Sequence, residues 1–128
     1  MPVEVLLIED NAGDARLIQQ ITSHSTVLVH TIVAESCVSA LAMLADGKYL
    51  PNLVITDMSV ASAAAPELLN RCNLKGVPVV VFSGSLNPAQ RAEALRLGAR
   101  EFVEKPYGID EYTAALWNLI WRWTSAQA

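Results

Sequence analysis

Residues 3–10 read VEVLLIED, an apolar run that ends directly in two acids. Similar runs, rich in Val, Ile and Leu, recur at residues 28–33, 53–56, 78–82 and 101–103. Most of them lack the alternation of polar and apolar residues that a strand with one face in water shows. Such runs are typical of strands that are covered on both faces, as in a parallel sheet.

A segment with helical spacing of apolar residues follows each of these runs. Helices are expected at about residues 14–24, from Ser36 to Asp46-Gly47, from near Pro66, from Asn87-Pro88 to Gly98, and from near Asp110 to about Trp123. Ser and Asn are good N-caps, and glycine suits the position just after a helix. Strict alternation with short links predicts an α/β fold: a (βα)5 doubly wound five-stranded parallel sheet with helices on both faces.

Reactive side chains follow the strands of this predicted sheet. Glu9 and Asp10 follow the first strand, Asp57 ends the third, Ser83 follows the fourth and Lys105 follows the fifth. Each residue type alone is commonly a turn former, a helix cap or a solvated surface group. In an open parallel sheet, however, the carboxyl ends of the strands share one rim, where ligands bind. Together, these residues therefore favour a functional site.

The chemistry of this set points to phosphoryl transfer. Three neighbouring acids repel one another, and a hard divalent cation relieves the repulsion; Mg²⁺ takes one or two carboxylates and keeps several waters. The metal and Lys105 would neutralise the oxygens of a transferring phosphoryl group. Asp57 could then act as a covalent nucleophile and form an acyl phosphate.

Four segments carry a resemblance to a known family: LIEDN at residues 7–11, LVITD at 53–57, VVFSG at 80–84 and GAREFVEKPY at 98–107. In this order and at this spacing they resemble the receiver domain of two-component response regulators (CheY-like), from Val3 to about Trp123. The resemblance implies the flavodoxin-like strand order 2-1-3-4-5. It also implies a stand-alone receiver, residues 1–128, that works in a cytoplasmic phosphorelay with a sensor histidine kinase.

The resemblance implies roles in phosphoryl transfer. Asp57 would be the phosphoacceptor, and Lys105, joined to Pro106 by a cis peptide, would pair with the phosphoryl oxygens. Mg²⁺ would be bound by Asp57, by Asp10 directly, by Glu9 mostly through water and by the backbone carbonyl of Ser59. Such a chain is a signalling receiver with intrinsic phosphotransfer and autodephosphorylation, not a metabolic enzyme.

The resemblance also implies a switch. Ser83 would turn its hydroxyl toward the phosphoryl group, and Phe102 matches the aromatic position that moves inward with it. Gly84 would leave room for the incoming group.

A narrower resemblance rests on EDNAGDARL at residues 9–17 and on the tryptophan-rich last helix. These features resemble the small regulators that serve bacterial phytochrome kinases, which makes a bacteriophytochrome the expected kinase.

The segment after Asp57 departs from the family pattern. Alanine stands at position 61, where proline is common, and at position 65, where glycine is common. A non-glycine residue with positive φ is costly, so the loop shape and the phosphoryl lifetime are expected to differ. This departure leaves a receiver-like interaction scaffold without phosphorylation as the alternative.

Two other functions with related chemistry fit less well. A flavodoxin-like cofactor binder needs a loop rich in Ser, Thr and Gly after the first strand, whereas Glu9-Asp10 would repel a phosphate there. A phosphatase with an aspartate nucleophile at that place would resemble an Asp-x-Asp pattern, which Asp10-Asn11-Ala12 does not fit.

Composition restricts the partners. The chain is 52% hydrophobic and 17% charged, which is enough apolar material for a filled core. Its formal net charge is −4 and it has no stripe of Lys and Arg, which argues against nucleic-acid binding. No apolar run approaches the roughly 20 residues that span a bilayer. Cys37 and Cys72 lack a metal-ligand spacing, so reduced thiols in a cytoplasmic protein are expected.

The last helix offers a candidate surface. At 100° per residue its core face is expected to hold Ile109, Tyr112, Leu116, Leu119, Ile120 and Trp123. Trp117 and Trp121 lie to one side of that face. They either pack against a neighbouring helix or form a homodimer or partner interface, where tryptophan is favoured.

Overall fold

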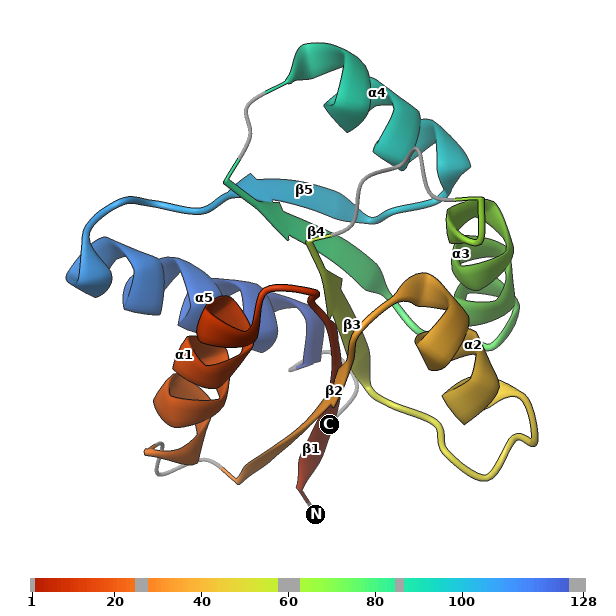
Figure 1. Ribbon diagram of the computed structural model, residues 1–128, viewed down its shortest axis with the longest axis horizontal. Coiled ribbons are helices and arrows are strands. Elements are labelled where there is room, and N and C mark those ends of the chain that lie inside the picture. The colour runs from red at the N-terminus through yellow and green to blue at the C-terminus, as the bar shows by residue number, and fades with distance from the viewer. Residues whose placement is uncertain (1, 25–27, 58–62, 85–86, 125–128) are drawn as a thin grey trace.

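The computed structural model describes residues 2–24, 28–57, 63–84 and 87–124. Parallel strands form one sheet in the order β2-β1-β3-β4-β5, as predicted (Figure 1). The strands are β1 Val3–Ile8, β2 Val29–Ala34, β3 Leu53–Thr56, β4 Val79–Ser83 and β5 Glu101–Glu104. The helices that alternate with them are α1 Ala12–Ser23, α2 Cys37–Leu44, α3 Ala65–Leu74, α4 Pro88–Leu97 and α5 Ile109–Thr124.

Two hydrophobic cores lie on opposite faces of the sheet. Helices α1 and α5 cover one face, and α2, α3 and α4 cover the other (Figure 1). Strand β1 serves both cores, because Leu6 and Ile8 point into one while Val5 and Leu7 point into the other. Burial on both faces explains why the strand sequences do not alternate between polar and apolar residues.

Side-chain caps set the helix ends near the carboxyl rim. The Ser36 side chain accepts a hydrogen bond from the Ser39 backbone N–H, and the Asn87 side chain accepts from Ala89 and Gln90. Asn11 caps α1 in the same way, so this helix begins two residues before the predicted start. Gly98 ends α4 with a φ of +116°, which confirms the predicted glycine stop.

Helix α5 differs from prediction at its start. Tyr112, Leu116, Leu119 and Ile120 are buried as expected, but Ile109 is 58% exposed, so its predicted place in the core is wrong. Ile109 opens the helix nearly one turn before the first buried residue and borders a shallow groove between α1 and α5. In the described part of the chain, no helix has both the length and the apolar character to cross a membrane.

Candidate functional site

Sheet register brings the predicted site together. Ile8 pairs with Thr56 across β1 and β3, and the Asp57 N–H donates to the Ile8 carbonyl at 3.1 Å. Glu9 and Asp57 therefore leave neighbouring strands at the same level. Toward the β5 edge of the sheet, the Lys105 N–H donates to the Ser83 carbonyl at 2.7 Å, which extends the β4–β5 ladder by one residue. The lysine thus starts from the same rim as the acids.

Lys105 is the centre of the site. Its Nζ donates to Glu9 Oε1 at 3.0 Å, to Asp57 Oδ2 at 3.0 Å and to Asp14 Oδ2 at 3.2 Å. An ammonium has three N–H donors, so each carboxylate takes one. The exposed fractions of the side chains are 1% for Glu9, 9% for Lys105, 25% for Asp57 and 41% for Asp14. Solvent and ligands therefore reach the site past Asp57 and Asp14.

The charges at the site do not balance. Burial raises the pKa of Glu9, although the hydrogen bond and charge of Lys105 act to lower it. Burial also acts to lower the pKa of Lys105, but its hydrogen bonds to Asp57 and Glu9 outweigh that effect and raise the pKa overall. Lys105 is therefore a cation at neutral pH. One ammonium among three carboxylates leaves the site with an excess of negative charge.

The acids form a donor set for a hard cation. One carboxylate oxygen from each of Glu9, Asp14 and Asp57 lies within 4.8 Å of the others. Carboxylate oxygens are the ligands that Mg²⁺ and Mn²⁺ prefer. The excess negative charge at this rim fits a divalent cation for the same reason.

Sequence reasoning missed Asp14 as a site residue. The sequence pattern assigns Asp14 only to the start of a helix and to the segment at residues 9–17. The available signal was Asn11, a good N-cap, because a cap there places Asp14 in the first turn beside the rim. Asp10, the predicted direct metal ligand, is exposed and lies outside the group of three acids; it borders a hollow with Arg16 and Glu35. Its role stays a prediction.

The other predicted residues occupy varied places. Ser83 is half-buried at the end of β4, and Phe102 is half-buried against the core beneath α3 and α4. Gly84 faces open space, since a Cβ there would meet nothing within 4 Å. Ser59 lies outside the described residues, as does most of the unusual loop.

Two expectations about the backbone are corrected. No cis peptide occurs in the described residues, so the predicted cis bond between Lys105 and Pro106 is wrong; the trans form is the ordinary one, favoured by roughly 0.5–1 kcal/mol before proline. Ala65 is the buried first residue of α3, and no described residue other than glycine has a positive φ. The cost expected from the missing glycine at that position therefore does not arise.

Comparison with known proteins agrees with this geometry. The model of the response regulator receiver domain family matches residues 5–117. The transcriptional regulatory protein KdpE of Mycobacterium tuberculosis is 29% identical over 125 residues, which are 95% of this chain and 53% of KdpE. The chain thus spans about half the length of that relative. The response regulator Rcp1 of Synechocystis sp. is 33% identical over 95 residues, which cover 67% of this chain and 65% of Rcp1.

Solved structures match over nearly the whole chain. The phosphorylated cyanobacterial phytochrome response regulator RcpA superposes with a TM-score of 0.83 at 24% identity and covers 98% of this chain and 96% of its own. The Mn²⁺-bound form of Rcp1 gives a TM-score of 0.79 at 24% identity, with 96% and 95% covered. At this identity the likeness establishes the fold. That the receiver stands alone stays a prediction.

Proposed function

Because the chain belongs to the response regulator receiver domain family, we propose that Asp57 accepts a phosphoryl group from a sensor histidine kinase in a Mg²⁺-dependent reaction. The observation that carries this proposal is the 3.0 Å contact between Lys105 Nζ and Asp57 Oδ2, beside the buried Glu9. Asp57 is the acid that combines contact with the lysine, partial exposure and a place at the end of a central strand.

The chemistry follows from these contacts. A carboxylate oxygen of Asp57 forms a bond to phosphorus, and the phosphorus–nitrogen bond of the donor phosphohistidine breaks. The imidazole leaves with the bonding electrons and takes up a proton. Lys105 carries its charge to the transferring oxygens and reduces the repulsion between the two anions. Because its side chain is only 9% exposed, little water screens that charge.

The carboxylates of Glu9 and Asp57 fit a bound Mg²⁺, and the family resemblance adds Asp10 and the Ser59 carbonyl as ligands. When bound, the cation would offset the charge of the phosphoryl oxygens.

The switch would begin at β4 and β5. Ser83 and Lys105 are already joined through the backbone, and Phe102 pairs with Val81 on the neighbouring strand. We propose that the Ser83 hydroxyl turns to the phosphoryl group and that the Phe102 ring follows it inward. A movement of β5 against β4 would then change the surface formed by α4, β5 and α5.

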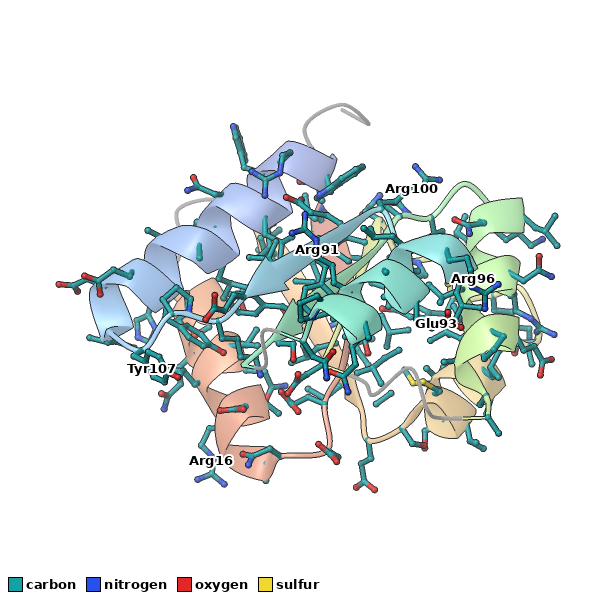
Figure 2. The ribbon with its side chains drawn as sticks, turned by 90° about the horizontal axis from the view of Figure 1, so that it is seen from above. Arg16, Arg91, Glu93, Arg96, Arg100 and Tyr107 are labelled. Atoms are coloured by element: carbon teal, nitrogen blue, oxygen red, sulfur yellow. The ribbon has the colours of Figure 1, made fainter. Side chains whose placement is uncertain are left out.

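Partners follow from charge and likeness. A histidine kinase of the bacteriophytochrome type is the proposed donor, supported by the likeness to a phytochrome response regulator. Nucleic acid is not a proposed partner, since the arginines do not form a stripe: Arg16 extends from α1, whereas Arg91 and Arg96 extend from α4, where Arg96 pairs with Glu93 (Figure 2). Cys37 and Cys72 are both buried and form no disulfide with each other, which suits the proposed cytoplasmic location.

The test is phosphorylation with a small donor. Incubation with acetyl phosphate, with and without Mg²⁺, is followed by mass spectrometry of the intact protein. One added phosphoryl group should appear only with Mg²⁺ and should be absent from Asp57→Asn. The control Asp46→Asn changes an exposed acid in the turn after α2 and should behave like the wild type. Absence of an adduct with acetyl phosphate and with phosphoramidate would favour the interaction scaffold.

A further inference from the structure

Asp14 reaches the site from a different layer of the fold than the other acids. Glu9 and Asp57 follow strands, whereas Asp14 lies in the first turn of α1. Its backbone is held there by the Asn11 cap, whose side chain accepts from the Asp14 N–H at 2.9 Å. From this fixed position its carboxylate contacts a lysine that is 91 residues away in the chain.

Asp14 occupies a donor that a phosphoryl group would otherwise use. All three N–H groups of Lys105 are taken, one each by Glu9, Asp14 and Asp57. Phosphorylation of Asp57 replaces its carboxylate with phosphoryl oxygens at one of these donors. A second N–H of Lys105 would become available to the phosphoryl group if the hydrogen bond to Asp14 broke. The negative charge of Asp14 also repels the phosphoryl group.

The same charge has the opposite effect on a cation. Without Asp14, the site loses one of the three carboxylates that surround Lys105 and with it part of the negative charge that attracts a metal ion. One residue therefore favours cation binding and opposes phosphoryl binding.

We propose that Asp14 is a positioning residue that competes with the phosphoryl group for Lys105 and so sets the balance between cation affinity and phosphoryl affinity. This inference rests on the proposed function of Asp57. Because Asp14 is 41% exposed, solvent screens its charge, and an effect of about fivefold on each affinity is expected, or about 1 kcal/mol at 1.4 kcal/mol per tenfold.

A plainer role for Asp14 is to stabilise the N-terminus of α1, where negative charge is favourable. Asp110 provides the matched control, since it is an exposed aspartate in the first turn of α5. If Asp14 only stabilised α1, its replacement would lower the stability of the fold but would not shift the cation affinity and the phosphoryl affinity in opposite directions.

The experiment measures both affinities on the full chain. Mg²⁺ is titrated into the unphosphorylated protein by calorimetry, and beryllofluoride, a mimic of the phosphoryl group, is then titrated at saturating Mg²⁺. Asp14→Asn should bind Mg²⁺ about fivefold more weakly and beryllofluoride about fivefold more tightly. The separate variant Asp14→Glu keeps the carboxylate and should have the wild-type affinities. Asp110→Asn should leave both affinities unchanged. Should Asp14→Asn fail to fold, Asp14→Ser is measured in the same way.

Two results would overturn the inference. If Asp14→Asn shifts both affinities in the same direction, or shifts neither, Asp14 does not set this balance, and the proposed function stands if the wild type still takes up phosphate from acetyl phosphate. A wild-type protein that takes up no phosphate overturns the proposed function first and this inference with it.

Discussion

Glu9 is buried beside two other acids, and its ionisation has an energetic cost. Its pKa in the folded protein lies above the ordinary 4.5, chiefly because of burial. Between the ordinary and the raised value, the folded chain binds more protons than the unfolded chain, so stability falls as pH rises through this window.

Glu9→Gln should remove that slope, because the amide keeps the shape of the side chain without its charge. We expect the free energy of unfolding at pH 7 to rise by on the order of 1 kcal/mol, since burying the uncharged amide avoids the cost of removing a carboxylate from water. Urea unfolding of both proteins between pH 4.5 and pH 7.5 measures the slope. A variant less stable than the wild type at pH 7, with an unchanged slope, would show that Lys105 fully compensates the buried charge.

At the residue scale, the sequence predicted the strand-end residues better than the residue from a helix. Glu9, Asp57 and Lys105 were expected to meet, because parallel strands share a rim, and they do. Glu9 directly follows β1 and is buried, whereas Asp10 is exposed in the bend beyond it and lies outside the group of three acids. Asp14 returns to the rim because α1 begins at Ala12, directly after its cap Asn11, and the spacing of the acids does not reveal that cap.

At the scale of elements, strands were easier to predict than helix ends. Strands β1 and β3 have the predicted bounds, because their mainly apolar runs stop at acids or turns. The first turn of α1 has only small side chains beside Asp14, with the first large apolar residue at Leu17, so the sequence predicts its start two residues too late. Similarly, the apolar period of α5 includes Ile109, but the core begins only at Tyr112.

Gly98 tests how much the end of α4 contributes to stability. Its φ of +116° suits glycine, and a Cβ there would overlap Nδ2 of Asn73, which donates to the Gly98 carbonyl at 3.3 Å. Gly98→Ala should therefore lower the free energy of unfolding by about 2 kcal/mol.

Gly47→Ala is the matched control, because Gly47 has a φ of +72° and open space around its Cα. Only the backbone cost, about 1 kcal/mol, is expected there. Urea unfolding at one pH compares the two variants, and equal losses would mean that the contact with Asn73 adds nothing.

At the scale of the whole molecule, the two tryptophans of α5 have different surroundings. Trp117 is half-buried against the core beneath α1 and α5, whereas Trp121 is 57% exposed. The packing role foreseen for both residues therefore fits Trp117, and the interface role fits Trp121.

Trp121→Ala should weaken self-association and change the free energy of unfolding by less than about 0.5 kcal/mol, as is usual for exposed positions. Trp117→Ala should instead destabilise the fold by about 2 kcal/mol, because it removes packed aromatic surface. Light scattering after size-exclusion chromatography gives the mass, and thermal unfolding gives the stability. Tyr107→Ala, at a fully exposed aromatic residue before α5 (Figure 2), is the control. An unchanged mass for Trp121→Ala would remove the proposed dimer surface.

The location of the phosphoryl group tests the whole account most directly. The protein is phosphorylated with acetyl phosphate and Mg²⁺, the acyl phosphate is reduced with borohydride, and the digested peptides are read by mass spectrometry. Reduction converts a phosphorylated aspartate to homoserine, and we predict this change at position 57 alone. Homoserine at position 10 or 14 with Asp57 intact, or no reduced residue at all, would contradict the assignment of Asp57 as the phosphoacceptor.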